Sequence, residues 1–85
     1  MAGHIAYYTY VLESEAKPGV RYIGYTSDIK QRISDHNSGK CSHTAKFRPW
    51  KLKLYIAFED IEHARRFERY LKTGSGHAFA NRHFW

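Results

Sequence analysis

The stretch VRYIGYTSDIKQRISDHNSG, residues 20–39, decides the fold of this chain. Residues 20–25 are rich in aromatic and β-branched types, which favour a strand. Asp28 follows as a good helix N-cap, and Gln31 three residues later completes a capping-box pattern. Gly39 supplies the left-handed residue that commonly ends a helix. The stretch therefore predicts a strand that leads directly into a capped helix.

The segments on either side predict two further strands. Residues 5–12 are again aromatic and β-branched, and the turn signal Pro18-Gly19 lets them pair with residues 20–25 as a hairpin. Alternation places Ile5, Tyr7, Thr9 and Val11 on one face of that strand, and Ala6, Tyr8, Tyr10 and Leu12 on the other. Residues 51–58 also alternate, which is typical of a half-buried strand. The apolar face expected there consists of Leu52, Leu54, Ile56 and Phe58.

The rest of the chain predicts a loop and two helices. The basic segment 40–51 is expected to be a loop. Asp60 caps a helix over residues 61–72. The glycines of segment 74–76 are expected to break that helix, and residues 77–84 are expected to form a short last helix.

These elements fit one small domain. A chain of 85 residues has room for a single core. The expected order is β-β-α-β-α with one more helix, which predicts a single α+β domain over residues 1–85. Its sheet is expected to be three-stranded, mainly antiparallel and flanked by helices. The lone Cys41 excludes an internal disulfide, and no leader pattern or membrane-length apolar run is present, so we expect a cytoplasmic protein.

The positive charge of the chain is unevenly distributed. Lys and Arg total 14, Asp and Glu total 8, and the net charge is +6. No acidic residue occurs between Asp35 and Glu59. That gap contains Lys40, Lys46, Arg48, Lys51 and Lys53. A stretch of one sign attracts polyanions, most often nucleic acid, although a basic face that aids solubility is the alternative interpretation.

Arg32 and His36 lie one helical turn apart in the predicted first helix. Both flank the apolar stripe that contains Ile29 and Ile33, so they should lean over the edge of the sheet. Arginine there suits a phosphate, because its planar fork matches two oxygens. The alternative is an arginine that runs along the core and pairs with a carboxylate.

Glu68 occupies a position where its helix should carry an apolar side chain. Residues Ile61, Ala64, Glu68 and Leu71 follow the spacing of one helix face. A carboxylate in that row must be paired, protonated or bound to metal, because an unpaired buried charge is costly. It is either a divalent-metal ligand of the kind that holds Mg²⁺ or a structural ion pair with Arg32 or Lys72.

Three tyrosines lie close together on the paired strands, namely Tyr8, Tyr10 and Tyr22. Tyrosines on strands usually serve packing, and a phenol is a poor base unless a metal or a cation lowers its pKa. By themselves they therefore carry little functional information.

Taken together, these residues resemble the GIY-YIG nuclease domain. The second half of that signature is intact as Tyr22-Ile23-Gly24, and the first half falls on Tyr8-Thr9-Tyr10. The arginine of the family's helix falls on Arg32, the polar residue one turn later on His36, and the metal-binding glutamate on Glu68. The resemblance covers the chain from Ile5 to about Phe84. Segment 36–40, Thr44 and Pro49-Trp50 are similar to small stand-alone bacterial members related to the excision-repair incision subunit.

The sequence departs from the family pattern in the first tripeptide and at Tyr25. Tyr8 and Thr9 replace the family's glycine and isoleucine, so the first tripeptide keeps only its tyrosine. Tyr25 stands where some relatives carry a lysine. Asn81 is a candidate for an asparagine that the family often has near its end.

The resemblance implies a metal-dependent endonuclease that hydrolyses phosphodiester bonds, in DNA more than RNA. A single Mg²⁺ or Mn²⁺ would be held by Glu68, and Arg32 would stabilise charge on the phosphate. Tyr10 or Tyr22 would orient the attacking water or accept its proton, with His36 as partner or alternative base. The flanking nucleic acid would be held by Lys40, Thr44, Lys46 and Arg48.

Other interpretations remain open. The alternative function is a non-catalytic module that keeps the fold and binds nucleic acid or protein. The small size of the chain favours either this module or a nuclease whose specificity comes from a protein partner. His36, Cys41 and His43 suggest zinc, but their spacing matches no common ligand pattern. Cys41 as a nucleophile beside His43 lacks an orienting third group. We expect a monomer or a weak dimer, and Trp85 is expected to pack within the domain or against a partner.

Overall fold

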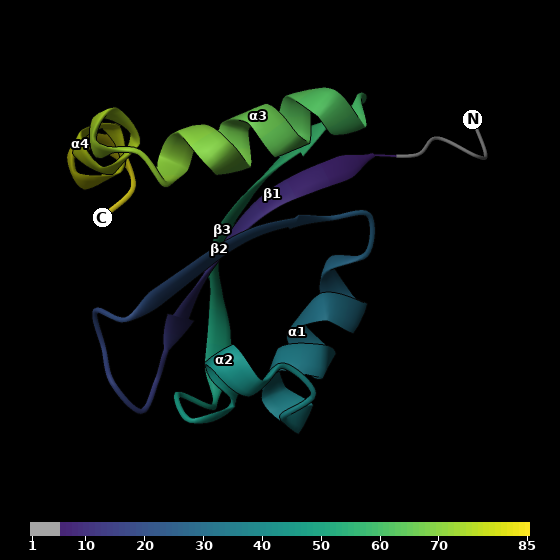
Figure 1. The fold of residues 1–85 in the computed structure, drawn as a ribbon, viewed down its shortest axis with the longest axis vertical. Helices are drawn as coiled ribbons and strands as arrows, with labels where there is room; N and C mark the ends of the chain where they lie inside the picture. The colour runs from purple at the N-terminus through teal and green to yellow at the C-terminus, as the bar shows by residue number, and fades with distance from the viewer. Residues whose placement is uncertain (1–5) are drawn as a thin grey trace.

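The computed structural model describes residues 6–85 (Figure 1), so Ile5 of the predicted first strand lies outside the described residues. Strands β1 (Tyr7–Ser14), β2 (Arg21–Thr26) and β3 (Trp50–Phe58) form one sheet in the order β2-β1-β3. Both pairings are antiparallel. The predicted α+β fold with a three-stranded antiparallel sheet is therefore confirmed, and β2 is an edge strand.

The helices cover both faces of this sheet. The helices are α1 (Ile29–Ser38), α2 (Ser42–Ala45), α3 (Ile61–Leu71) and α4 (Gly74–His83). Figure 1 shows α1 and α2 on one side of the strands and α3 and α4 on the other. Within residues 6–85, no helix is long and apolar enough to cross a bilayer.

The alternation predicted for the first strand is confirmed. Tyr10 and Leu12 pack with Trp50 on the α1 side. Val11 packs with Leu71 on the α3–α4 side. The central strand is therefore buried on both faces, which a sheet with helices on both sides requires.

The loop predicted over residues 40–51 is wrong in part, because Ser42–Ala45 forms the short helix α2. No side chain caps it. Its support is tertiary: the Trp50 Nε1–H donates to the Thr44 carbonyl at 2.9 Å, and the Thr44 hydroxyl contacts His36. Trp50 and His36 both lie outside α2, so the residues of α2 by themselves do not predict this helical turn.

The segment 74–76 begins α4 instead of separating two helices by a break. Thr73 caps α4 by accepting from the Gly76 N–H at 3.1 Å. A Cβ on Gly76 would lie 1.9 Å from the Tyr70 carbonyl oxygen. Gly76 therefore allows α4 to turn tightly against the end of α3, and the predicted start of the last helix at residue 77 is three residues late.

A β-bulge corrects the alternation predicted for residues 51–58. Val11 pairs with Leu54 whereas Leu12 pairs with Leu52, so Lys53 is the extra residue. Leu52 consequently shares the α1 side with Leu12, and Leu54 shares the opposite side with Val11. The prediction that Leu52 and Leu54 share one face is wrong.

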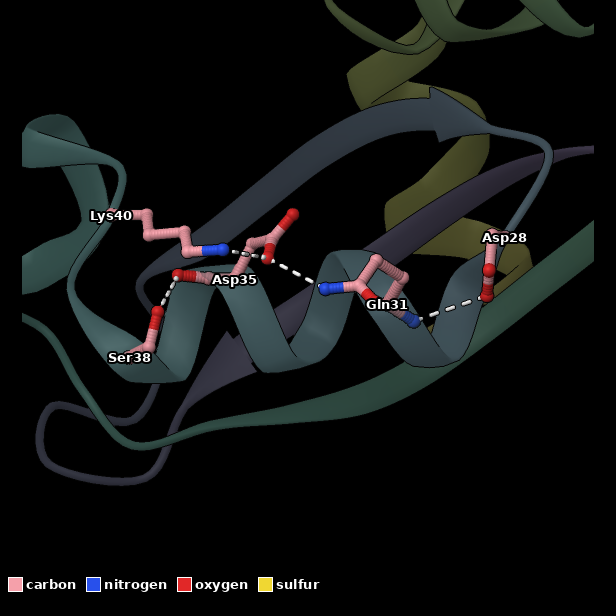
Figure 2. A network of polar contacts seen from close by, with 5 residues as sticks. All are labelled: Asp28, Gln31, Asp35, Ser38 and Lys40. Atoms are coloured by element: carbon pink, nitrogen blue, oxygen red, sulfur yellow. Dashed lines mark hydrogen bonds and ion pairs between the residues drawn. The ribbon is translucent and has the colours of Figure 1, made fainter.

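The capping of α1 is confirmed in its first half and corrected in its second. The Asp28 carboxylate accepts from the Gln31 N–H at 3.1 Å, but the Gln31 side chain donates to Asp35 at 2.9 Å instead of turning back to the cap. Lys40 pairs with Asp35 at 3.4 Å. Figure 2 shows this chain of contacts along the outer side of α1. Gly39 ends the helix with φ 87°, as predicted.

Candidate active site

A cleft of about 240 Å³ opens at the free edge of β2. Its lining comes from β1, β2, α1 and α3, and consists of Tyr10, Tyr22, Gly24, Tyr25, Arg32 and Glu68. Because β2 is an edge strand, side chains from both faces of the sheet can meet there. The structure thus brings together four of the five residues that carry the predicted site, and His36 is the exception.

Gly24 allows Tyr10 to reach this edge from the central strand. Tyr10 pairs with Gly24 across the hairpin. A Cβ on Gly24 would lie 2.6 Å from the Tyr10 hydroxyl oxygen and 2.8 Å from Cζ. The phenol therefore lies directly over the position that a side chain would fill, and a close approach of this kind requires glycine. The sequence signal for this role is a glycine opposite an aromatic residue in the hairpin.

Glu68 reaches the cleft from the α3 side. Its side chain is 13% exposed and forms an ion pair with Lys72, one turn later on the same helix. Of the two ion-pair partners considered from the sequence, Lys72 is the one found. The predicted apolar row is confirmed at Ala64 and Leu71, which are buried, whereas Ile61 is exposed.

His36 lies behind the cleft instead of lining it. Its side chain is fully buried, with Nε2 3.3 Å from the Tyr10 hydroxyl and Nδ1 2.9 Å from the Thr44 hydroxyl. Its ring centroid is 4.6 Å from that of Tyr22. His36 can therefore influence the cleft only through the tyrosines that separate it from solvent.

The hydrogen bonds around His36 define its tautomer. The Thr44 hydroxyl donates to the Cys41 carbonyl at 3.3 Å, so it accepts from Nδ1–H of His36. Nε2 is then the unprotonated nitrogen, and it accepts from the Tyr10 hydroxyl. The Tyr10 proton points toward His36, which leaves the oxygen lone pairs of Tyr10 for the cleft.

Burial keeps Tyr10 and His36 neutral near neutral pH. Desolvation raises the pKa of Tyr10, Tyr22 raises it further, and the nearby Arg32 guanidinium opposes the rise. Desolvation also lowers the pKa of His36, and the Arg32 charge adds to this while Asp35 opposes it. Tyr10 is consequently a protonated phenol bonded to a neutral imidazole.

Arg32 contributes the positive charge of the cleft from α1. It is partly buried and also lines a neighbouring hollow that contains Tyr7, Tyr25 and Ile61. No carboxylate in residues 6–85 lies within ion-pair distance of its guanidinium. The guanidinium therefore has the capacity to bind an incoming anion.

The basic residues predicted to hold nucleic acid lie around α2 and do not line this cleft. Lys40 is paired with Asp35, the Lys46 ammonium lies 5.3 Å from the centre of the Phe47 ring, and Arg48 donates to the Ala45 carbonyl at 2.8 Å. All three are exposed.

Two further predicted residues also lie away from the cleft. Thr44 is only 3% exposed and its hydroxyl is committed to His36 and Cys41, so its predicted contact with nucleic acid is wrong. Asn81 lines a different cleft on the α4 side, and it accepts from Trp85 Nε1–H at 3.0 Å. Instead of contacting nucleic acid, the Thr44 hydroxyl orients the imidazole of His36.

The donor set of the cleft suits a hard divalent cation. The Glu68 carboxylate and the tyrosine hydroxyls are oxygen donors, and Mg²⁺ is commonly held by one carboxylate together with waters and substrate phosphates. Across residues 6–85, no three His, Cys, Asp or Glu residues are grouped to hold a metal without such help. The zinc site considered for His36, Cys41 and His43 is therefore not formed.

Comparison with known proteins gives three kinds of finding. The sequence model of a family described as the GIY-YIG catalytic domain matches residues 6–81. The chain is 41% identical over 66 residues to the UPF0213 protein SAG0778 of Streptococcus agalactiae serotype V, covering 76% of this chain and 73% of that protein. It is 40% identical over 67 residues to the UPF0213 protein BH0048 of Halalkalibacterium halodurans, covering 78% and 69%.

The third finding is structural. The solution NMR structure of the UPF0213 protein BH0048 from Bacillus halodurans has a TM-score of 0.55 and 31% identity to this chain, covering 94% of this chain and 87% of that one. The similarity in sequence and in fold spans the hairpin, α1 and α3, which together carry the cleft.

Proposed function

Because this chain belongs to the GIY-YIG catalytic domain family, a family of nuclease domains, we propose that it is a divalent-metal-dependent endonuclease that hydrolyses phosphodiester bonds. One observation carries the proposal: Arg32 from one side of the sheet and Glu68 from the other line a single cleft with Tyr10 and Tyr22. A binding module gains nothing from a carboxylate placed beside phosphate. The resemblance to the excision-repair incision subunit favours DNA as the substrate, with a role in repair in the cytoplasm.

Glu68 is the residue proposed to hold Mg²⁺ or Mn²⁺. A bound cation would supply Lewis-acid polarisation of the phosphate and charge neutralisation at the leaving oxygen. Glu68 must first exchange its Lys72 partner, which is half-exposed and free to turn toward solvent or toward a phosphate. The ion pair therefore holds the carboxylate in position until the substrate complex forms.

Arg32 is proposed to bind the nonbridging oxygens of the scissile phosphate. Its guanidinium donates in a planar fork, and it meets developing negative charge in a partly desolvated cleft. These interactions strengthen as the pentacoordinate transition state gains charge on those oxygens.

Tyr10 and His36 are proposed to move the proton of the attacking water. The water would give a proton to the Tyr10 oxygen while the Tyr10 hydroxyl proton passes to Nε2 of His36. The resulting hydroxide forms the new P–O bond, the bond to the leaving oxygen breaks with its electron pair on that oxygen, and solvent protonates it. This relay avoids a free phenolate, which the raised pKa of Tyr10 disfavours. The lowered pKa of His36 then favours return of its proton through Tyr10 to solvent, which restores the neutral pair. Tyr22 would orient the water from the other wall of the cleft.

The basic side chains around α2 are proposed to hold the nucleic acid outside the cleft. Lys40, Lys46 and Arg48 are exposed on one end of the domain. Tyr25, 36% exposed at the rim of the cleft, would contact the same strand. Binding through these residues should weaken steeply with salt.

The first test is cleavage of labelled single-stranded, duplex, flap and branched DNA with Mg²⁺, Mn²⁺ or EDTA. We expect metal-dependent cleavage that Glu68→Gln and Arg32→Ala each reduce by at least about 100-fold, since each removes transition-state stabilisation. The matched controls are Glu62→Gln and Lys30→Ala, which alter exposed residues on the same two helices. Both controls should retain the wild-type rate.

The competing function is a non-catalytic nucleic-acid-binding module. The Glu68–Lys72 ion pair is the observation that favours it, because it satisfies the carboxylate without a metal. Binding without cleavage on every substrate, unchanged in Glu68→Gln, would establish the module and make Glu68 a structural residue.

A further inference from the structure

A second and larger cleft follows the same free edge of β2. Its volume is about 500 Å³, and it lies toward the N-terminal end of the strand. Ile23, Leu71 and Ala80 form apolar parts of its wall, and Arg21 and Lys72 supply positive charge. A concave site of this size with an apolar wall and a few polar groups is typical of a small-ligand pocket.

The charge of this larger cleft favours an anion. Neither Asp nor Glu occurs in its lining. Glu13, which faces Arg21 across the hairpin, is held by Lys53 at 2.9 Å. The Nε of Arg21 is buried and has no hydrogen-bond partner within residues 6–85. Arg21 therefore lines a cleft that contains no carboxylate, and its own Nε has no partner in the protein.

The same arginine stacks over an aromatic ring. Its guanidinium carbon lies 4.2 Å from the centre of the Trp85 ring. Both groups line the cleft. Nucleobases stack on aromatic rings and on arginine planes, so an unpaired base would extend this stack.

The two clefts are neighbours along β2. Tyr22 lines both of them. Lys72 lines the larger cleft and is paired with Glu68, which lines the smaller one. A ligand in the larger cleft would therefore adjoin the phosphate proposed to bind at Arg32 and Glu68.

We propose that the larger cleft binds an unpaired nucleotide next to the scissile phosphate, with its base on the Arg21–Trp85 stack and its phosphate at Arg21 and Lys72. This inference rests on the proposed nuclease function and defines the substrate class as nucleic acid with a single-stranded segment at the cut. Bases of an intact duplex are already paired and stacked, and entry into a pocket would require unstacking them. A flap, a gap or a single strand supplies the nucleotide at no such cost.

Tryptophan fluorescence tests this pocket without cleavage. Trp50 is 4% exposed in the core, whereas Trp85 lines the cleft. In EDTA, a short single-stranded oligonucleotide should quench the fluorescence of the Trp50→Phe protein, whose signal comes from Trp85. The blunt duplex of the same sequence should quench it far less, and the Trp85→Phe protein should not respond.

Affinity measurements in EDTA provide the second readout. Because loss of one stacked base costs about 1–3 kcal/mol, Trp85→Ala should bind the single strand roughly 5- to 150-fold more weakly. Arg21→Lys should also weaken that binding, because it keeps the charge and loses the plane. Arg66→Ala, an exposed arginine on α3 outside the lining, should affect single strand and duplex equally.

The outcomes separate this inference from the proposed function. Trp85-dependent binding of single strands without any cleavage would overturn the nuclease and keep the pocket. Cleavage with no quenching of Trp85, or an equal loss of single-strand and duplex affinity in Arg21→Lys, would keep the nuclease and overturn the pocket. The fluorescence of the Trp50→Phe protein tests nucleotide binding in the larger cleft even if Trp85→Ala does not fold.

Discussion

On the α1 side of the sheet the buried side chains include the imidazole of His36 and the hydroxyl of Thr44, whereas the buried cluster on the α3–α4 side is apolar. That cluster consists of Val11, Leu71 and Ala80. The partly buried aromatic residues around it are Phe67, Phe79, Phe84 and Trp85. Both sides contain aromatic rings, and the difference lies in their buried polar groups. On the α1 side the imidazole of His36 is hydrogen-bonded to two other side chains, whereas on the α3 side the buried Thr9 hydroxyl donates only to a backbone carbonyl, that of Ala64.

This difference separates two tasks in a very small domain. Burying a polar group is costly unless its hydrogen bonds are met, and both ring nitrogens of His36 have partners. The α1 side thus gives up some apolar burial to orient Tyr10. The α3–α4 side contributes an apolar core cluster and places Glu68 in the shared cleft. Substitutions on the α1 side should reduce activity most, and those on the other side, apart from Glu68 itself, should reduce stability most.

The largest expected effect is on activity, from Tyr10→Phe. The change keeps the ring over Gly24 and removes only the hydroxyl that contacts His36. If the Tyr10–His36 relay moves the proton, the single-turnover cleavage rate should fall by about 10²–10⁴-fold. The free energy of unfolding should fall by about 1–3 kcal/mol, because Nε2 of His36 loses its partner.

Tyr8→Phe is the matched control for that variant. Tyr8 lies on the same face of β1, but its ring packs against Tyr55 and lies outside the cleft lining. It should cleave at the wild-type rate. Equal rates for Tyr10→Phe and the wild type would remove the relay and leave the α1 side with a purely structural network.

The next effect is on stability, from glycines at the α3–α4 corner. A Cβ at position 76 would meet the backbone of Tyr70 and Leu71, so we expect Gly76→Ala to cost about 3 kcal/mol, the upper end for overpacking. A Cβ at position 74 would meet no atom within 4 Å, and Gly74→Ala should be neutral or stabilise by up to about 1 kcal/mol.

Urea unfolding of the two variants measures this difference directly. Cleavage per folded molecule should stay near the wild-type value in both, because neither glycine lines the smaller cleft. If Gly76→Ala unfolded at the same urea concentration as Gly74→Ala, the tight corner would not be what holds α4 to α3.

Local signals in the sequence predict the parts of the fold that depend on neighbouring residues. The Asp28 cap, the Gly39 stop and the strand faces of Tyr10 and Val11 each follow from short-range patterns, and each is confirmed. The bulge at Lys53 escapes prediction, because Leu52 and Leu54 fit strict alternation equally well and only the pairing with β1 reveals the extra residue.

The same distinction holds for the candidate site. Residues that stand out locally, such as Glu68 in an apolar row, point to the smaller cleft. The nucleic-acid contact predicted for Thr44 does not fit its burial, and nothing near Thr44 in the sequence indicates its bond to His36. The larger cleft escapes prediction altogether, since Arg21 and Trp85 are remote in the chain and ordinary in their own segments.

The smallest expected effect is a pH dependence of stability that arises from His36 alone. Burial lowers its pKa in the folded protein, so the unfolded chain takes up a proton first as the pH falls below the ordinary value of 6.5. The free energy of unfolding should therefore decrease from pH 7 toward about pH 5.5, because protonation favours the unfolded state.

In His36→Gln this slope should be flatter, whereas His43→Gln, which alters an exposed histidine on α2, should keep it. Urea midpoints at several pH values measure the slope. An identical slope in His36→Gln would mean that burial on the α1 side does not hold the imidazole neutral, and the contrast between the two sides would then rest on activity alone.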